Sequence, residues 1–179
     1  MKNIRVVVLI ILSVTMLAGF RFLRSQRFVC PIKYDNKILV RCDDRGDGFF
    51  GTGRSGGRLH NGVDLYAKVG VPVVASRAGR VIKAAQNYGM GKFVVIRHRG
   101  GYTTVYGHLS KIYVKRYQRV RQGQTIGAVG KTGNARYREM LPHLHFEVKK
   151  NGIPQDPLKY IRDKSNEQPV DVSVVGTGP

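Results

Sequence analysis

Four side chains in this sequence have the types and the spacing of a metal site. His60 and Asp64 stand four residues apart, and His143 and His145 flank a single leucine. Asp64 is the only acidic residue within residues 48–138, a stretch that is rich in lysine and arginine. Two imidazoles and one carboxylate suit Zn²⁺ and leave a fourth position for water. This combination predicts a zinc site that activates water for hydrolysis.

A turn or a strand end should bring His60 and Asp64 together. The Asn61-Gly62 step between them argues against a helix, and the glycine lets the backbone curl so that both side chains reach one point. The two downstream histidines lie in a β-rich run, in which residues two apart face the same side. The apolar residues of that run face the opposite way, toward a core. Both imidazoles should therefore enter one cavity.

Three further polar residues are candidates for supporting roles. His108 follows a β-rich run and could point into the same cleft, or serve as a surface or capping histidine. His98 ends a basic strand beside two glycines, which favours a structural or exposed position. Glu147 lies on the face of the two downstream histidines and could orient a ligand as an acceptor, or form a salt bridge.

The central part of the chain predicts a small all-β domain. Short apolar runs are separated by glycine turns, which is typical of strands. The clearest runs are residues 72–76, 80–85, 92–97, 102–106, 125–129 and 143–148. Few segments carry a helical period, and the best of them, residues 109–117, predicts a turn or a short helix. This pattern favours a small β-sandwich or barrel.

Residues 1–24 predict an export signal or a membrane anchor. Lys2 and Arg5 precede an apolar run over residues 6–20, and arginines follow it. The run is shorter than the roughly 20 residues that cross a bilayer comfortably, which favours a signal peptide, whereas the poor cleavage site favours an uncleaved anchor. Either way an N-terminal hydrophobic helix exports the chain to the cell envelope, in the periplasm or cell wall. Lipidation is rejected because Phe20 stands where the lipidated cysteine would be needed.

Residues 25–58 form a lead-in to the central domain. Cys30 and Cys42 flank alternating apolar residues with turn composition around Asn36. A hairpin centred there would place the cysteines opposite each other, so we expect a disulfide, with two free thiols as the alternative. A glycine-rich stretch completes the lead-in. At the other end, residues 162–179 are polar and predict a disordered tail.

The charge of the chain indicates an anionic partner. Lysine and arginine number 31 against 11 aspartates and glutamates, which gives a formal net charge of +20. Nucleic acid, anionic lipid and acidic wall polymers all attract such a chain. The export signal and the absence of a recognised nucleic-acid motif argue against nucleic acid. An anionic wall polymer or a membrane surface is therefore expected, with a solvated basic face that binds no partner as the alternative.

Three separated motifs resemble the lysostaphin/LytM-type zinc metallopeptidases, which are peptidoglycan endopeptidases. The motifs are His60-x3-Asp64, Tyr106-Gly-His108-Leu and His143-Leu-His145-Phe-Glu, in this order. The resemblance covers residues 57–161 and includes the Gly-Lys-Thr-Gly turn that ends at residue 133. It implies an antiparallel β-sandwich or barrel-like hybrid with an open groove across one sheet.

The resemblance also implies roles for individual residues. His60, Asp64 and His145 would bind Zn²⁺, and His143 and His108 would stand beside the metal as general base or oxyanion partners. A metallopeptidase domain over residues 59–161 would then hydrolyse the peptide cross-links of bacterial peptidoglycan.

One segment departs from the family pattern. Residues 134–142, which approach the His-x-His strand, are longer and more basic than in many family members, and this bears on the groove wall and on substrate preference. Many relatives lost metal ligands and act as activators of other wall enzymes. This chain retains all five histidine and aspartate positions, which favours activity over the alternative of a non-catalytic wall-binding module or amidase activator.

Overall fold

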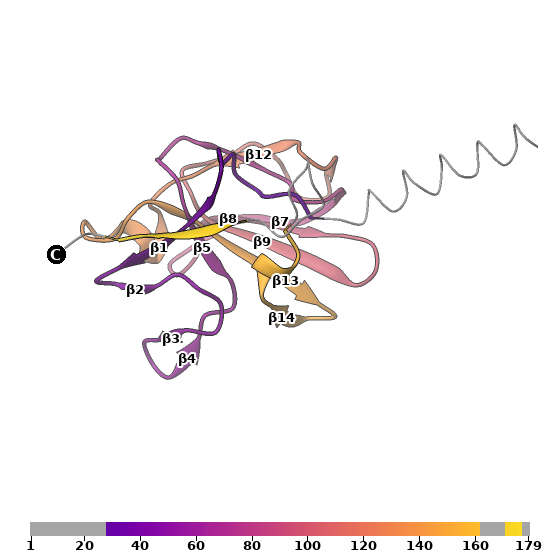
Figure 1. Cartoon of the computed structure of the whole chain (residues 1–179). Coiled ribbons are helices and arrows are strands. Elements are labelled where there is room, and N and C mark those ends of the chain that lie inside the picture. The colour runs from indigo at the N-terminus through magenta and orange to yellow at the C-terminus, as the bar shows by residue number, and fades with distance from the viewer. Residues whose placement is uncertain (1–27, 162–170, 177–179) are drawn as a thin grey trace, which may run out of the picture.

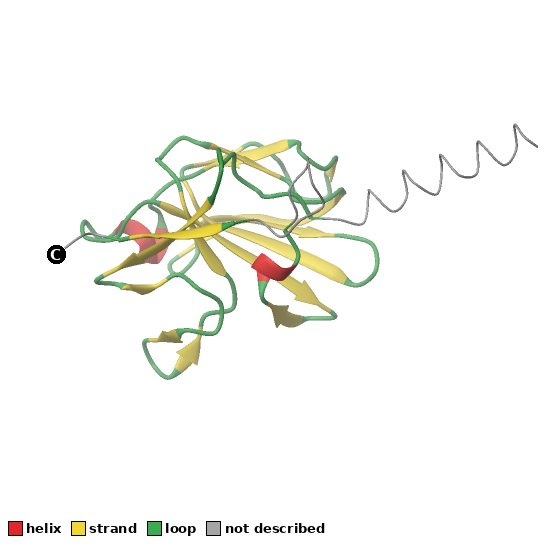
Figure 2. Cartoon of the chain, viewed as in Figure 1, coloured by secondary structure: helices red, strands yellow, loops and turns green. Residues whose placement is uncertain are grey.

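Strands and loops make up nearly all of the computed structural model, which describes residues 28–161 and 171–176 (Figures 1 and 2). Two short 3-10 helices, η1 (Gly133–Arg136) and η2 (Pro157–Lys159), are the helices in these ranges. The expected all-β class is therefore confirmed. The apolar run expected to form an N-terminal helix lies outside the described residues, and within them no helix is long and apolar enough to cross a membrane.

A ten-stranded sheet forms the frame of the domain. Its strand order is β11-β7-β8-β9-β13-β5-β1-β15, with β2 paired to β1 and β14 paired to β13. Neighbours in this order run antiparallel, except for the parallel pair of β1 and β15. The strands are β1 (Ile38–Asp43), β2 (Gly46–Asp47), β5 (Val63–Tyr66), β7 (Gly79–Asn87), β8 (Gly91–Arg97), β9 (Tyr102–Leu109), β11 (Arg119–Val120), β13 (His143–Lys150), β14 (Ile153–Gln155) and β15 (Val172–Val175).

A three-stranded sheet lies across one face of the large sheet, with β12 at the top of Figure 1. Its strands are β6 (Pro72–Val74), β10 (Lys111–Ile112) and β12 (Thr125–Ala128). Side chains from both sheets, such as Ile126 and Phe146, join one hydrophobic core. A small hairpin of β3 (Gly53–Arg54) and β4 (Arg58–Leu59) projects from the body (Figure 1).

Alternation of apolar residues explains the central strand β13. Leu144, Phe146 and Val148 are fully buried, as residues two apart on one face of a strand should be. Burying each such side chain contributes about 1.5–3 kcal/mol to folding. All six runs expected as strands contain one, so this part of the prediction is confirmed.

A turn or a short helix was expected over residues 109–117; a turn is present at residues 116–117, and the helix is wrong. Lys111 and Ile112 form β10 and pair with β12, and Tyr113 N donates to Ile126 O at 2.9 Å. Cross-strand bonds thus take up the backbone groups that a helix would use. The weak helical period of this segment suggested a helix, but pairing with the neighbouring strand decides its conformation.

The hairpin expected around Asn36 is also wrong. The chain before β1 instead runs beside β6, where Val29 N donates to Ser76 O at 2.9 Å and Pro31 O accepts from Val74 N at 2.8 Å. Pro31 has no N–H to offer to a hairpin ladder. Cys30 and Cys42 therefore do not meet, and both are free thiols.

The polar tail differs from its prediction over a short stretch. Val172–Val175 forms β15 and pairs in parallel with β1, with Ile38 opposite Val172. The β-branched residues of this stretch suit a strand, and they protect the open edge of β1.

We expect both cysteines to be available as thiols. Cys42 is partly exposed and should react with a maleimide in the folded protein, whereas Cys30 is buried, which raises its pKa to about 12, and should react only after unfolding. Mass spectrometry before and after denaturation, without reductant, would count the modified sites. A mass showing no modification in denaturant would contradict the free-thiol state.

Candidate metal centre

Three side chains converge on one point at the end of the large sheet. His145 Nδ1 lies 2.9 Å from Asp64 Oδ1 and 3.0 Å from His60 Nε2. His60 Nε2 lies 3.1 Å from the same Asp64 oxygen. All three residues are buried, and their ligand atoms form the cluster of the described residues that could hold a metal ion.

Strand pairing brings these side chains together. β5 and β13 are neighbours, and their register sets Asp64 directly opposite His145. On the other side of β13, Gly107 of β9 stands opposite His145. A Cβ at Gly107 would crowd Met90 and His145, so the glycine leaves room for the imidazole.

Gly62 is required for a different reason from the one expected. A Cβ at this position would clash with Phe146 O and would lie 3.0 Å from Glu147 Cγ. The glycine therefore permits the close approach of β13. The backbone at Gly62 is not left-handed, so the expected curl between His60 and Asp64 is not the reason that a glycine is needed there.

Hydrogen bonds fix which nitrogens carry protons. His60 Nδ1 lies 2.8 Å from Phe49 O, and a carbonyl only accepts, so Nδ1 is the donor and Nε2 presents a lone pair. His145 Nε2 lies 3.1 Å from Glu147 Oε1, which in neutral His145 leaves the lone pair on Nδ1. Two lone pairs that face each other beside a carboxylate oxygen repel unless a proton or a cation lies among them. This donor set therefore fits a metal ion.

The pKa shifts in the cluster also indicate that it favours a bound cation. Burial would raise the pKa of Asp64, but His143, His145 and His60 hold it well below its usual value. Burial likewise opposes a charged His145, yet hydrogen bonds to Asp64 and Glu147 outweigh it and raise the His145 pKa to about 9. Without a metal the site thus captures a proton on His145.

His143 and His108 stand beside this cluster and complete the five expected residues. Their rings lie 5.0 Å apart between centroids, and His108 lies 5.8 Å from the His145 ring. His143 Nδ1 donates to Leu141 O at 2.7 Å, and His108 Nδ1 donates to Thr132 O at 2.9 Å. Both Nε2 atoms are then left as acceptors.

Burial keeps both of these histidines neutral. It lowers the pKa of His143, and it lowers the pKa of His108 to about 3 with help from the neighbouring His143 and His145. His143 differs from His108 in its distance from a carboxylate, because its Nε2 lies 3.9 Å from Asp64 Oδ1. Asp64 therefore favours a proton on His143.

Two arginines that the sequence analysis missed hold the outer oxygen of Asp64. Arg41 Nη2 lies 2.9 Å from Asp64 Oδ2, and Arg54 Nη2 lies 3.2 Å from the same atom. Both guanidinium groups satisfy Oδ2, so Oδ1 is the oxygen left to face the histidines. The available signal was an arginine at the end of the apolar run Ile38-Leu39-Val40, where burial forces it to find a carboxylate.

Asp43 extends this arrangement to the groove wall. Its Oδ1 accepts from Arg41 Nη1, and its Oδ2 accepts from Leu141 N at 2.8 Å. Arg41 is only 2% exposed, so its charge is neutralised inside the protein by two carboxylates. The chain of contacts runs from Asp64 through Arg41 and Asp43 to the segment before His143.

The remaining candidates have structural roles. His98 is buried and bonds Ala78 O and Thr104 Oγ1, at 2.9 and 2.8 Å, at the end of β8 that lies away from His108. Glu147 combines both expected roles, because it accepts from His145 and pairs with Lys149 at 2.9 Å.

An open groove of about 750 Å³ leads to the cluster. The β3–β4 hairpin forms one side, and the turn between β7 and β8 forms another, with Tyr88 and Met90. The basic segment after η1 supplies Tyr137 and Met140. Arg136 Nη2 donates to Tyr88 OH at 3.1 Å, so this segment is tied to the β7–β8 turn. Four arginines also line the groove: Arg41, Arg45, Arg54 and Arg58.

Replacing Gly62 by alanine should destabilise the protein by about 1–3 kcal/mol, because the added Cβ meets the backbone of β13. Gly53→Ala is the matched control, since no atom lies within 4 Å of a Cβ there. Urea unfolding of both variants measures the difference. Equal midpoints would contradict the close approach at Gly62.

Replacing Arg41 by methionine should cost about 3–5 kcal/mol of stability in the metal-free protein, because it strands two buried carboxylates. Arg45→Gln removes an exposed pair with Glu139 and should leave the unfolding midpoint nearly unchanged. Urea unfolding in chelator tests both. A wild-type midpoint for Arg41→Met would refute this role of Arg41.

Known proteins with related sequences include one named as a peptidoglycan endopeptidase and one named as a lipoprotein homolog. The chain is 45% identical over 100 residues to the peptidoglycan DD-endopeptidase ShyC of Vibrio cholerae, which covers 56% of this chain and 22% of ShyC. It is 38% identical over 108 residues to a lipoprotein NlpD/LppB homolog of Pseudomonas aeruginosa, which covers 60% of this chain and 35% of that protein. The chain thus spans about a third or less of the length of these curated relatives.

Solved structures share the fold. A zinc-containing peptidase from Vibrio cholerae superposes with a TM-score of 0.60 at 34% identity, over 73% of this chain and 39% of that one. The catalytic domain of lysostaphin from Staphylococcus simulans gives 0.55 at 33% identity, over 63% of this chain and 87% of that one. The model of peptidase family M23 matches residues 58–157, more than half of the sequence. The chain belongs to peptidase family M23.

Proposed function

We propose that this chain is a zinc-dependent endopeptidase that hydrolyses peptide cross-links of bacterial peptidoglycan. The observation that carries the proposal is the cluster itself. Three ligand atoms lie about 3 Å apart at the floor of an open groove, and two of them are imidazole nitrogens that present lone pairs. Membership of a peptidase family and relatives named as peptidoglycan endopeptidases support it.

In this proposal His60, Asp64 and His145 hold Zn²⁺. Bound zinc would lower the pKa of a coordinated water toward about 7 and polarise the scissile carbonyl. Arg41 and Arg54 keep Asp64 Oδ2 occupied, so that the carboxylate offers one oxygen. Glu147 holds His145 in the tautomer that presents Nδ1.

His143 is the proposed general base. Its Nδ1 is held by Leu141 O, its Nε2 is free to accept, and Asp64 Oδ1 at 3.9 Å stabilises the imidazolium that forms. The same proton would pass to the amine as the peptide bond breaks. His108 has no carboxylate as close, and we assign it to positioning the substrate carbonyl beside His143.

The groove suits an anionic peptide. It is open along the surface, and Arg45, Arg54 and Arg58 line it besides the buried, neutralised Arg41, with Asp64 and Glu147 as its acidic lining residues. Carboxylates of peptidoglycan stem peptides would meet this positive wall. We expect the N-terminal signal to export the chain to the cell envelope, where this substrate lies.

The alternative function is a non-catalytic wall-binding module or an amidase activator. It needs neither the metal nor a proton acceptor, and it gives no reason for two neutral histidines beside a metal-ligand cluster. Activity that survives chelation, or zinc-loaded protein that releases no fragments, would favour it.

Digestion of purified peptidoglycan should give peptide-bond products that disappear with a chelator and return with zinc. His143→Ala should lower their rate of release by roughly 100- to 10,000-fold while zinc stays bound, because the variant lacks only the proton acceptor. Mass spectrometry of the fragments and zinc analysis of the same sample measure both. Full activity in His143→Ala would sink its role as base.

Asp64→Ala should lose zinc as well as activity, since it removes a ligand and one of the two carboxylates that pair with Arg41. Asp171→Ala is the matched control, because its carboxylate is exposed and pairs only at the surface with Lys37. Metal analysis after dialysis separates the two. Wild-type zinc content in Asp64→Ala would contradict the ligand assignment.

A further inference from the structure

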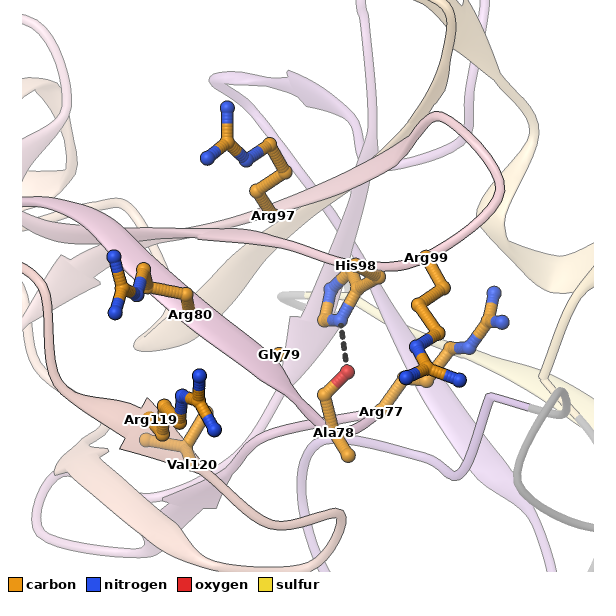
Figure 3. Close-up of a pocket in the computed structure, with 9 residues that line it drawn as sticks. All are labelled: Arg77, Ala78, Gly79, Arg80, Arg97, His98, Arg99, Arg119 and Val120. Carbon is orange, nitrogen blue, oxygen red and sulfur yellow. Dashed lines mark hydrogen bonds between the residues drawn. The ribbon is translucent and has the colours of Figure 1, made fainter. Parts of the chain in front are cut away.

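A second pocket, of about 550 Å³, is lined mainly by arginines (Figure 3). No carboxylate is among its lining residues. Its basic residues are Arg77, Arg80, Arg97, Arg99 and Arg119, with His98 between them. The pocket takes no part in the proposed peptidase mechanism.

Three of these arginines stand in one row across the sheet. Arg80 of β7 is directly opposite Arg97 of β8 and directly opposite Arg119 of β11. Like charges in directly opposite positions destabilise a sheet. In residues 28–161 and 171–176, none of the ion pairs includes a member of this row. The row therefore carries an uncompensated cost that a bound anion would remove.

No side chain fills the centre of the pocket floor, which therefore stays hollow. Gly79 lies at its centre (Figure 3), and a Cβ there would clash with Arg97 O. His98 is held by Ala78 O and Thr104 Oγ1, and burial lowers its pKa to about 4, so it adds no charge of its own. A guanidinium-lined hollow with a rigid neutral floor suits phosphate, which arginine binds in a bidentate manner.

This pocket lies at the far end of the β7–β8 hairpin from the metal centre. The turn of that hairpin, at Tyr88 and Met90, lines the peptidase groove, whereas Arg80 and Arg97 stand at the opposite ends of the two strands. Strands of this length separate the two sites by about 20 Å. A ligand in the arginine pocket leaves the groove free.

The N-terminal side of the chain meets the domain at this pocket. Phe28 packs edge-on against His98, with ring centroids 5.8 Å apart, and the Arg77 guanidinium carbon lies 5.5 Å from its centroid. Seven residues connect Phe20, the end of the apolar run, to Phe28, and these eight chain steps span at most about 29 Å. An apolar run in a bilayer would keep the pocket within reach of lipid headgroups.

We propose that the arginine pocket binds the phosphate groups of anionic phospholipids and docks the domain on a membrane surface. Three observations support this assignment: the row of Arg80, Arg97 and Arg119, the hollow floor of the pocket and the adjacent Phe28. The assignment is independent of the peptidase reaction. The docked domain would present its groove on the side away from the membrane.

The test uses the full chain and vesicles of phosphatidylglycerol with phosphatidylcholine, against phosphatidylcholine alone, at physiological ionic strength. The pocket variant is Arg80→Gln, Arg97→Gln and Arg119→Gln combined. The matched control removes the same charge from exposed residues outside the pocket: Lys111→Gln, Lys115→Gln and Arg116→Gln. Sedimentation with the vesicles gives the partition coefficient, and thermal unfolding verifies that each variant is folded.

We expect the pocket variant to lose on the order of 100-fold in partition onto the anionic vesicles. The control should lose far less, and all three proteins should bind phosphatidylcholine alone equally, because the apolar run is unchanged. In case the triple variant does not fold, Arg97→Gln alone should show a smaller loss in the same direction.

Equal losses in the pocket and control variants would overturn the proposal, because net charge would then explain the binding. A second arm titrates inorganic phosphate alone in the absence of vesicles. Phosphate binding without any preference for the anionic vesicles would assign the pocket to a soluble anion. Wall binding that depends on the arginine row, with vesicle binding unaffected, would assign the pocket to a wall polymer. Either of these two results would refute the proposal that the pocket binds lipid.

Discussion

The register between β5 and β13 is the constraint on which the site depends. Setting Asp64 opposite His145 places a carboxylate and an imidazole on the same face at a distance of 2.9 Å. A slip of β13 by one residue would turn His145 to the other face of the sheet, away from Asp64. The alternating core residues of β13 prevent that slip, because Leu144 and Phe146 would then leave the core. Hydrophobic packing thereby fixes the geometry of the polar cluster.

Electrostatic compensation is what lets so many polar groups be buried together. Asp64 is surrounded by guanidinium and imidazole groups, and each imidazole has a defined acceptor on its far nitrogen. Each of these partners comes from a different part of the chain: Phe49 from the glycine-rich loop, Thr132 from the turn before η1 and Arg41 from β1. The loops around the sheet thus position the histidines, whose rings could otherwise rotate.

Patterns within short stretches of the sequence were enough to predict much of the site. The His-x-His pair on a strand follows from alternation, and the structure brings all five expected residues together. Gly62 was expected to allow a turn, but the structure requires it for the close approach of β13. Pairing partners distant in sequence were not visible. The segment around Asn36 has hairpin composition, but its backbone bonds to Val74 and Ser76. Arg41 escaped notice because its meaning comes from Asp64, 23 residues away.

The positions of Arg41 and Arg54 in the sequence bear on where the functional unit begins. The family match starts at residue 58, after both arginines, and β15 returns from beyond its end to cover β1. A fragment trimmed to the matched residues would keep all five histidine and aspartate positions and still expose the Asp64 carboxylate to water on its outer side. The lead-in thus supplies two side-chain partners of Asp64 that the matched region lacks.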